Sequence, residues 1–454
     1  MSADNTPTTD DVRAYYVRRI KTTEEAHAPL AASVGQPRYP AGDVDIRIPQ
    51  RADERMPTVV DLFCGAGGLT IGFEDAGLNV AVASDIWHPT AETHRANFPS
   101  VPFLETDIRE VSPEDIRRYC GGSAPDVVAG GPPCQGFSSA GARSDSDARN
   151  TLVGYYANLA VELEPSVIVF ENVEGFLTAG GGAFVTDLLD PLIGAGYSVR
   201  LEKLNVAHFG VPQLRKRVIA IATKGRTPAH LEPSHSASGA PGVWRRGVGL
   251  PYTSTVADAL NYMVADSSDK LSESRESSEI ERKRIEALKP GQTMRDLDPS
   301  LHHASFARRA NRRVADGMPT EKRGGAPAGL RRLIADEPSK AITSAAVREF
   351  VHPTADRMIT LREAAILQTF PADFQFIGTR SEIATMIGNA IPPAFAAALG
   401  SAVLETLRQP QGESRGQLTD FIVTHADAMS PALAKTVSLV NQRYSTVSAT
   451  PALF

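Results

Sequence analysis

One cysteine in this chain stands where a catalytic nucleophile is expected. Cys134 belongs to the run Gly-Gly-Pro-Pro-Cys-Gln-Gly-Phe-Ser, which begins at Gly130 and follows three apolar residues. The apolar run predicts a buried strand, and the two prolines predict a stiff turn that presents the thiol at its end. A thiol held among small neighbours is typical of a nucleophile. The competing interpretation is a buried structural cysteine, which is common for free thiols.

Three further polar side chains stand beside predicted strands and could act on the same substrate. Glu171 follows an apolar strand, where its carboxyl could protonate or hydrogen-bond a ring nitrogen. Arg215 and Arg217 lie two apart in an extended segment, so their side chains should point the same way and could grip a carbonyl oxygen and a phosphate. Each of them alone could equally form a surface salt bridge. Their joint occurrence beside strand ends favours one site.

A glycine-rich turn early in the chain predicts a nucleotide-binding site. The stretch Asp-Leu-Phe-Cys-Gly-Ala-Gly-Gly begins at Asp61, follows a predicted strand and opens a predicted helix. Glycines at such a turn let the backbone approach a ligand closely. Asp85 ends the next strand, where a carboxylate can bind a ribose diol, and Asp107 could accept from an adenine amino group. The weak phosphate cradle favours S-adenosylmethionine over NAD.

The elements that must position these residues alternate between strands and helices. Strands are predicted over 58–63, 79–84, 126–129, 166–170, 197–205 and 218–223. Helices are predicted over 69–76, 90–97, 151–163, 183–193, 361–367 and 393–407, with one short helix near 11–23. This alternation predicts an α/β fold with a doubly wound, mostly parallel sheet. Ligands of such sheets bind at the carboxyl ends of the strands, where the glycine-rich turns of this sequence occur.

The order of these motifs resembles that of the cytosine-C5 DNA methyltransferases. The matching stretches are Asp-Leu-Phe-x-Gly-x-Gly-Gly, Gly-Pro-Pro-Cys-Gln-Gly-Phe-Ser, Glu-Asn-Val, Gln-x-Arg-x-Arg and Gly-Asn-Ala-Ile-Pro-Pro. Further matches are Asp147-x-Arg149-x-x-Leu152 and the run that begins Arg357-x-x-Thr360-x-Arg362-Glu363. The resemblance covers about 57–224 and 338–400. It implies an S-adenosylmethionine-dependent enzyme with a small loop-rich target-recognition domain, which methylates a flipped-out cytosine through a covalent cysteine adduct and uses no metal.

The same resemblance implies roles for individual residues. The cytosine would be handled by Cys134, Glu171, Arg215 and Arg217. The methyl-donor site would be lined by Asp61, Phe63, Gly65, Gly67, Asp85, Ile86, Asp107, Ile108, Pro132, Leu152 and Asn389. Gln135 and Ser138, in the cysteine loop, are expected to contact DNA. One departure is Ile86, which would cover the adenine where an aromatic residue is usual.

Charge is unevenly spread along the chain. The formal net charge is −6, yet 13 Lys and Arg stand against 6 Asp and Glu between Glu281 and Arg332, a local net of +7. A basic segment on an acidic body is expected where one part of a protein meets phosphates. DNA contacts are expected from Arg308, Arg309, Arg312 and Arg313, which a helix would carry along one broad face. The competing interpretation is a solvated helical face.

Length and composition indicate a globular protein of several parts. Of 454 residues 42% are hydrophobic, and no run approaches the roughly 18 apolar residues of a membrane span. The three cysteines lack metal-ligand spacing and suit a reducing cytoplasm. The predicted parts are an N-terminal extension (1–55), a catalytic domain (56–224 and 341–408), a target-recognition domain (225–340) and a tail of unknown role (409–454).

The favoured interpretation is a sequence-specific modification enzyme for double-stranded DNA. We expect a cytoplasmic monomer that belongs to a restriction-modification system or acts alone, with a restriction endonuclease of the same site as a candidate partner. RNA cytosine-C5 methylation is an alternative with the same chemistry. A catalytically silent, S-adenosylmethionine-binding regulatory protein is an alternative from another class.

Overall fold

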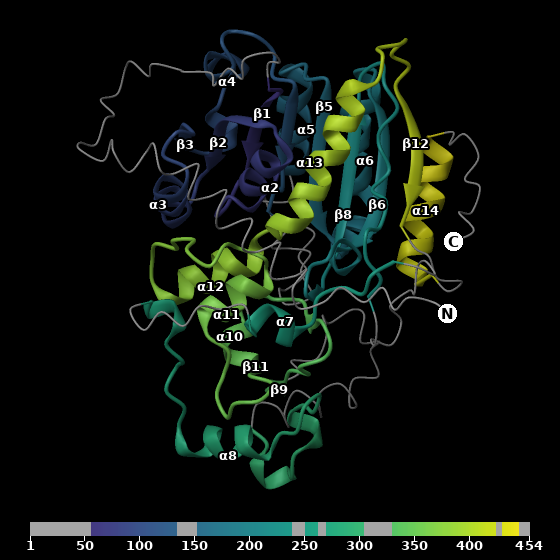
Figure 1. Ribbon diagram of the computed structural model, residues 1–454. Helices are drawn as coiled ribbons and strands as arrows, with labels where there is room; N and C mark the ends of the chain where they lie inside the picture. The colour runs from purple at the N-terminus through teal and green to yellow at the C-terminus, as the bar shows by residue number, and fades with distance from the viewer. Residues whose placement is uncertain are drawn as a thin grey trace, which may run out of the picture.

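The computed structural model describes residues 56–133, 152–237, 250–261, 269–303, 329–423 and 429–444. An eight-stranded sheet fills the upper half of the molecule in Figure 1, with the strand order β12-β6-β8-β5-β4-β1-β2-β3. Its strands are β1 (Thr58–Leu62), β2 (Asn79–Asp85), β3 (Phe103–Glu105), β4 (Val127–Gly130), β5 (Val167–Val173), β6 (Ser198–Asn205), β8 (Lys216–Thr223) and β12 (Gln417–Ile422). The prediction of an α/β fold with a mostly parallel sheet is confirmed.

The central strands are parallel and buried on both faces. In register, Val59 of β1 lies opposite Val127 of β4, and Val127 lies opposite Val167 of β5. Every residue of β1 and β4 is buried, which explains their near-continuous apolar runs. β8 alone runs antiparallel to its neighbours β5 and β6. This reversal places the residues at the start of β8 beside the carboxyl end of β5.

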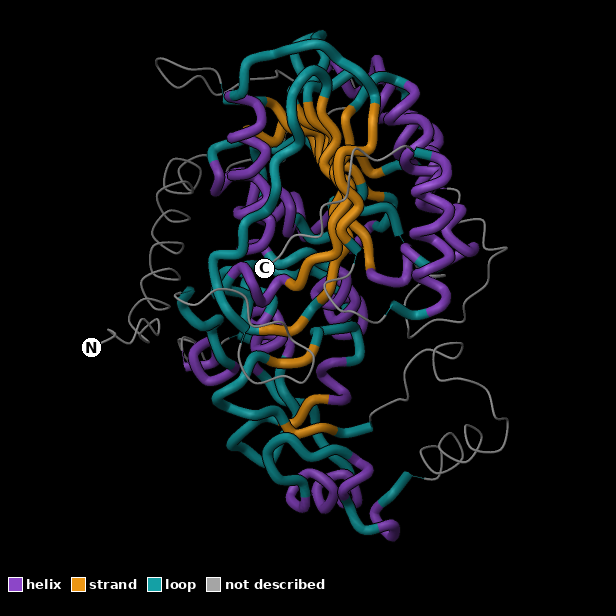
Figure 2. Tube along the Cα trace, turned by 90° about the vertical axis from the view of Figure 1, so that its right-hand side faces the viewer, coloured by secondary structure: helices purple, strands orange, loops and turns teal. Residues whose placement is uncertain are grey.

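Helices cover both faces of the sheet, as Figure 2 shows from the side. They are α2 (Gly68–Ala76), α3 (His88–Asn97), α4 (Pro113–Tyr119), α5 (Leu152–Glu162), α6 (Ala183–Gly194), α13 (Pro393–Arg408) and α14 (Pro431–Arg443). Two of these helices, α2 and α13, pack closely against each other. A side chain at Gly72 would lie 2.4 Å from the backbone nitrogen of Ala397, so only glycine allows the two helices to meet.

The C-terminal part of the chain completes the sheet. β12 pairs in parallel with β6, and Arg200 bonds Asp420 across the pair at 2.6 Å. α14 then folds back over one face of the sheet. There the Thr436 hydroxyl donates to the carbonyl of Leu177 at 2.7 Å. Residues that the sequence left without a role therefore form the edge strand and a covering helix.

A smaller lobe lies below the sheet in Figure 1. It holds the remaining elements, which are α7 (Val256–Asn261), α8 (Glu279–Ala287), α10 (Ala346–Glu349), α11 (Leu361–Leu367), α12 (Arg380–Asn389) and the short strands β7 (Gln213–Leu214), β9 (Arg331–Arg332), β10 (Ser339–Lys340) and β11 (Phe350–Val351). Its lower part has a small apolar core that includes Ile285, Leu288 and Met294. The buried guanidinium of Arg332 donates to the carbonyls of Ile285 and Leu288, which links β9 to the C-terminal end of α8.

One stretch, Arg380–Arg408, is long and apolar enough to cross a membrane by length and composition. It comprises α12 and α13, and 61% of its most apolar window is buried inside the fold. The stretch is therefore a pair of core helices and not a membrane span.

Candidate active site

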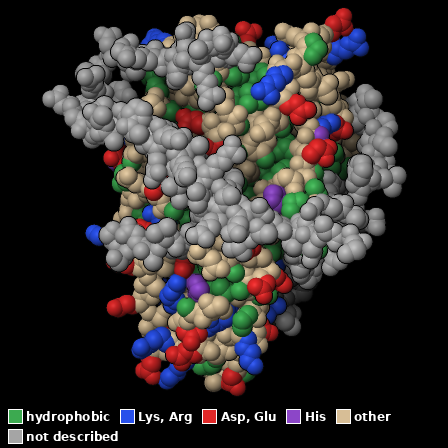
Figure 3. Space-filling model, viewed as in Figure 1, with side chains coloured by type: hydrophobic (Ala, Val, Ile, Leu, Met, Phe, Trp, Pro, Cys, Tyr) green, Lys and Arg blue, Asp and Glu red, His purple; other side chains and the backbone are tan. Residues whose placement is uncertain are grey.

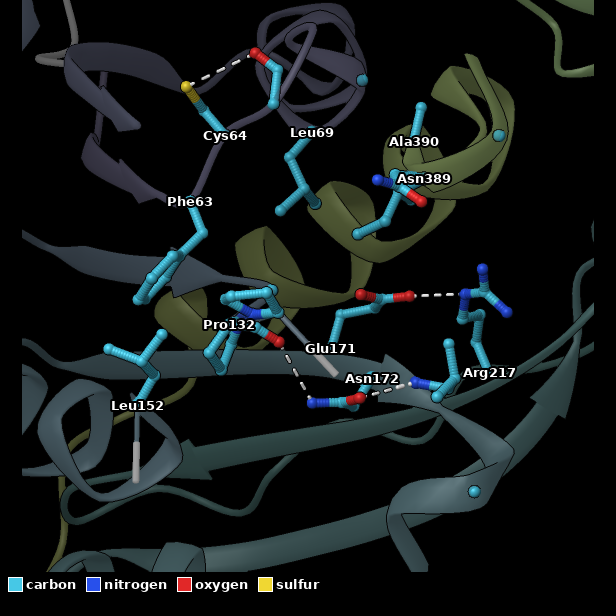
Figure 4. Close-up of a pocket in the computed structure, with 18 of the residues that line it drawn as sticks. Phe63, Cys64, Leu69, Pro132, Leu152, Glu171, Asn172, Arg217, Asn389 and Ala390 are labelled. Atoms are coloured by element: carbon cyan, nitrogen blue, oxygen red, sulfur yellow. Dashed lines mark hydrogen bonds and ion pairs between the residues drawn. The ribbon is translucent and has the colours of Figure 1, made fainter. Parts of the chain in front are cut away.

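A cavity of about 1350 Å³ opens at the carboxyl ends of the central parallel strands. The turn after β1, the end of β2, the prolines after β4 and the end of β5 all line it. Its opposite wall comes from the lower lobe, from the C-terminal half of α12, the two residues that follow it and the segment after β10. Figure 4 shows Phe63, Pro132 and Leu152 in one part of the cavity and Glu171 with Arg217 in another.

The glycine-rich turn is held in place by the carboxylate at the end of β2. The Gly65 N–H donates to Oδ2 of Asp85 at 3.0 Å, and the Trp87 N–H donates to Oδ1 at 2.9 Å. Phe63 and Gly65 adopt left-handed backbone angles, with φ of 57° and 55°. Such a conformation is costly for phenylalanine and typical of functional turns. Burial raises the pKa of the Asp85 carboxyl, while the hydrogen bonds that it accepts from backbone N–H groups lower this pKa.

The wall around this turn suits an adenosine group. Ile86 is 63% exposed although it is a large apolar side chain, and it lines the cavity together with Ile108 and Leu152. Apolar surfaces of this kind can cover a flat base. Asp107 also lines the cavity, but Arg109 bonds both of its oxygens and lowers the pKa of its carboxyl to about 2. Asp107 is therefore ionised and partly engaged. The predicted donor-site residues Phe63, Gly65, Asp85, Ile86, Asp107, Ile108, Pro132, Leu152 and Asn389 all line the cavity.

Two residues predicted for the donor site lie elsewhere. Asp61 is fully buried beneath the turn, and its Oδ2 accepts from the Thr70 hydroxyl at 2.8 Å. Burial raises the pKa of Asp61 to about 7. Gly67 lies at the start of α2, where a side chain would meet the ring of Phe98 at 2.6 Å. Neither lines the cavity, because both residues face into the packing that supports the turn.

The part of the cavity beside β5 and β8 holds an ion pair between these neighbouring strands. Nε of Arg217 lies 2.6 Å from Oε1 of Glu171, and these side chains are only 10% and 11% exposed. The pairing follows from the antiparallel register of β5 and β8, in which Val173 lies opposite Arg217. Burial raises the pKa of the Glu171 carboxyl, and the positive charges of Arg217 and Arg215 oppose this rise. A carboxyl in this environment holds a proton more readily than a solvated one.

Arg215 lines the same cavity but is differently bonded. Its terminal nitrogens donate to backbone carbonyls, at 2.5 Å to Ile342, 2.8 Å to Gly388 and 3.1 Å to Ala390. Arg215 and Arg217 were expected to point the same way and to hold one substrate together. Instead they bond different partners. Arg215 lies between β7 and β8 and reaches the lower lobe, whereas Arg217 reaches β5.

Sequence reasoning gave no role to Asn172, which is buried next to Glu171. Its amide donates to the carbonyl of Pro132 at 3.4 Å, so it links the end of β5 to the prolines that precede the cysteine. The Glu-Asn-Val motif contained this residue, but nothing in the motif indicates its acceptor. Trp87 also lines the cavity without having been predicted.

The remaining predicted residues lie outside the described part of the chain. They are Cys134, Gln135, Ser138, Arg308, Arg309, Arg312 and Arg313. Cys134 directly follows Pro133, which lines the cavity. Over the described part of the lower lobe, Lys and Arg side chains are interspersed with Asp and Glu (Figure 3).

Comparison with known proteins agrees with this geometry. The sequence model of the C-5 cytosine-specific DNA methylases matches residues 57–405. The chain belongs to this family. Its members methylate cytosine at C5 in DNA, and the chain is accordingly a DNA (cytosine-5-)-methyltransferase.

Curated relatives cover most of this methyltransferase. The type II methyltransferase M.XorII of Xanthomonas oryzae is 32% identical over 388 residues, which span 78% of this chain and 86% of the relative. M1.HphI of Haemophilus parahaemolyticus is 33% identical over 357 residues, 77% of this chain and 87% of the relative. M.AgeI of Thalassovita gelatinovora is 32% identical over 427 residues, which span 77% of this chain and 98% of the relative.

Solved structures show the same fold. A prophage-encoded E. coli protein assigned as a DNA modification methyltransferase superposes with a TM-score of 0.55 at 23% identity, covering 78% of this chain and all of that one. The Entamoeba histolytica methyltransferase EhMeth gives a TM-score of 0.52 at 15% identity, again over 78% of this chain.

Proposed function

We propose that this methyltransferase modifies cytosine within a specific sequence of double-stranded DNA as part of a restriction-modification system, with S-adenosylmethionine as methyl donor. The observation that carries the proposal is the Glu171–Arg217 pair in a cavity that also has a donor-type wall. Type II methyltransferases among the relatives support the restriction-modification role.

Cys134 is the proposed nucleophile. C5 of cytosine is a weak nucleophile, so the enzyme first adds the Cys134 thiolate to C6, which forms an S–C6 bond and moves the ring electrons toward C5. S-adenosylmethionine, when bound, supplies an electrophilic methyl group. Loss of the C5 proton and departure of the Cys134 thiolate then restore the aromatic ring. The attack requires access to a ring face, so the base must leave the helical stack.

Glu171 is the proposed acid and hydrogen-bond partner of the ring. As the thiolate adds, negative charge develops on N3 and O2 of the ring. A carboxyl whose pKa is raised by burial is suited to donate a proton to N3. Arg217 holds that carboxyl in place. Its positive charge is proposed to stabilise the negative charge that develops on O2.

The donor is proposed to lie along the turn after β1. Phe63, Ile86, Ile108 and Leu152 supply apolar contacts, and Asp85 supplies the carboxylate for the ribose. These residues fit an adenosine group because apolar surface and the Asp85 carboxylate converge at one part of the cavity.

DNA recognition is proposed for the lower lobe and the basic stretch between Glu281 and Arg332, where Arg308, Arg309, Arg312 and Arg313 stand. Gln135 and Ser138 are proposed to touch DNA from the cysteine loop. We further propose that the enzyme is a cytoplasmic monomer that protects DNA from a restriction endonuclease of the same specificity.

Mapping methylated cytosines in a host that expresses the chain tests this proposal. Conversion of unmethylated cytosine by bisulfite, followed by sequencing of DNA and RNA, should reveal 5-methylcytosine at one short motif in DNA. A Cys134→Ala host serves as the control. Modification confined to RNA would support the alternative substrate, and no modification in either would support a catalytically silent role.

A further inference from the structure

We propose that Arg215 is a positioning residue for the methyl-donor site, which holds the turn Gly388-Asn389-Ala390 in the cavity wall and does not contact the cytosine. This inference rests on the proposed function, because it assigns that wall to S-adenosylmethionine. All three residues of this turn line the cavity, and of them Asn389 is exposed whereas Gly388 is buried. Whatever fixes the turn therefore fixes the position of the Asn389 side chain.

The hydrogen bonds of Arg215 leave its terminal nitrogens no capacity for a paired contact with a base. One donates to the carbonyl of Ile342 at 2.5 Å, and the other donates to Gly388 at 2.8 Å and Ala390 at 3.1 Å. The side chain is fully buried, at 2% residue exposure. Rotating the guanidinium toward a substrate would remove this donor from the buried carbonyls of Ile342 and Gly388 and from the part-buried carbonyl of Ala390, and leaving a buried carbonyl without a donor is unfavourable.

Two of the three carbonyls that accept from Arg215, those of Gly388 and Ala390, lie at the C-terminal end of α12. The last carbonyls of a helix have no partner within the helix and carry a partial negative charge, so a cation is favoured beside them. α12 ends at Asn389, and the guanidinium bonds the carbonyls on either side of that residue. Arg215 thus caps this helix from the position between β7 and β8, two residues before Arg217.

A glutamine pair holds the same turn from a second direction. The Gln213 amide donates to Oε1 of Gln368 at 2.7 Å, and its Oε1 accepts from the Ile342 N–H at 3.0 Å. The Gln368 amide in turn donates to the carbonyl of Ile387 at 2.5 Å. Both glutamines are buried with no exposed surface. The turn is therefore fixed by a connected network, of which Arg215 is the charged member.

Close backbone packing limits the other positions that this turn could take. A side chain at Gly388 would lie 2.1 Å from the Ser344 nitrogen, and one at Gly68 would lie 2.1 Å from the Ile391 oxygen. The turn is wedged between the segment after β10 and the first residue of α2. Displacement by a weakened Arg215 network would consequently move the donor site and not only the turn.

Three variants separate donor positioning from cytosine chemistry. Arg215→Met and Gln368→Met remove hydrogen bonds to the turn with little change in volume, and Arg217→Met is the matched control two residues away. The first measurement is the Kd for S-adenosylmethionine by calorimetry, without DNA. The second is donor-free exchange of tritium from C5 of cytosine in DNA, which reports addition of Cys134 to C6 because that addition makes C5 basic.

We expect Arg215→Met to raise the donor Kd about tenfold or more, since 1.4 kcal/mol corresponds to a factor of ten, while exchange stays within about threefold of wild type. Gln368→Met should raise the Kd by a smaller factor. Arg217→Met should reverse the pattern, with a normal Kd and lost exchange. A normal donor Kd with lost tritium exchange in Arg215→Met would overturn the inference. Loss of both donor binding and exchange in a folded Arg215→Met protein would overturn it too.

The remaining outcomes are also decisive. If Arg215→Met does not fold, Gln368→Met decides, and an unchanged Kd in that variant contradicts the inference. If wild type binds S-adenosylmethionine but releases no tritium from DNA, the proposed function fails. The Kd comparison would still judge the role of the network, so the two failures can be told apart.

Discussion

Nε of Arg217 lies 2.6 Å from Oε1 of Glu171, and both side chains are largely withdrawn from solvent in the cavity wall. The pair joins β5 to β8, the only strand of the described sheet that runs antiparallel to its neighbours. It lies at the edge of the sheet where the prolines before Cys134 also line the cavity. Burial favours the protonated form of the carboxyl and the guanidinium favours its ionised form. The balance gives a group that can hold or release a proton during ring chemistry.

Glu171→Gln should lower the methylation rate by about a hundredfold or more, the usual contribution of a positioned acid. The amide keeps the size of the side chain but cannot give up a proton in the same way. Single-turnover kinetics with saturating DNA and donor measure the effect. The donor Kd should stay within about twofold of wild type because Glu171 is not part of the proposed adenosine wall. A variant with the wild-type rate would remove Glu171 from the mechanism.

Asp85→Ala should weaken S-adenosylmethionine binding by about tenfold to a hundredfold, or 1–3 kcal/mol if a buried ribose contact is lost. The Asp85 carboxylate also accepts from Gly65 and Trp87, so its loss loosens the turn itself. Calorimetry without DNA measures the change. Glu105→Ala is the control, because this carboxylate bonds His88 and Arg95 at the surface and does not line the cavity. Equal donor affinity in both variants would refute the placement.

Asp61→Asn should change how stability depends on pH. Burial raises the pKa of Asp61 in the folded protein to about 7, against an ordinary value of 3.8. The folded state therefore binds a proton that the unfolded state has released between these values. The resulting stabilisation is complete below the unfolded pKa and is lost as pH rises through about 7. Asparagine cannot ionise, so the variant should escape this loss.

Thermal unfolding from pH 5 to 8.5 tests this expectation. The Tm of wild type should fall relative to that of Asp61→Asn as pH rises. Asp107→Asn is the control, because Arg109 lowers the pKa of Asp107 to about 2 and moves its titration below the tested range. A difference in Tm between Asp61→Asn and wild type that stays constant across the range would contradict the assignment.

Neutralising Arg308 and Arg312 should flatten the salt dependence of DNA binding by roughly two units, since each phosphate contact contributes about 0.9 to the slope of log affinity against log salt. Binding to all sequences should weaken similarly. If one of these arginines reads a guanine edge, its loss should cost ~1–3 kcal/mol at the cognate site only. Replacing Arg309 and Arg313 as well extends the test. A full slope and unchanged specificity without all four would identify the cluster as a solvated face.

The sequence predicted the central sheet well because its strands are buried on both faces. Continuous apolar runs such as 127–129 have no competing helical pattern, and the observed strand boundaries differ by only a few residues from those expected. β12 and α14 escaped prediction because an edge strand and a surface helix are half polar. The Ser430 cap and the proline after it were nevertheless a readable start signal for α14.

Within the site, the sequence indicated which residues meet but not how each is bonded. Glu171 and Arg217 could be expected together, since each stands beside a strand end. The carbonyls that Arg215 serves follow it by more than a hundred residues, so local spacing carries no information about them. Asp61 was expected in the donor wall because it begins the glycine-rich motif, whose later residues do line the cavity. Side chains alternate along a strand, however, and that of Asp61 points away from the cavity and toward Thr70.

The central claim is that Cys134 attacks C6 of a cytosine in DNA, and covalent trapping tests it most directly. DNA in which 5-fluorocytosine replaces the target base should form a stable adduct with the protein in the presence of S-adenosylmethionine, because the fluorine at C5 cannot leave as a proton does. We predict that mass spectrometry places this adduct on Cys134 in wild type, that Cys64→Ala and Cys120→Ala form it too, and that Cys134→Ser does not. Cys64 and Cys120 are both buried, and burial raises the pKa of the Cys64 thiol well above its ordinary value, which disfavours a thiolate there. An adduct on any other residue, or one formed by Cys134→Ser, would contradict the account.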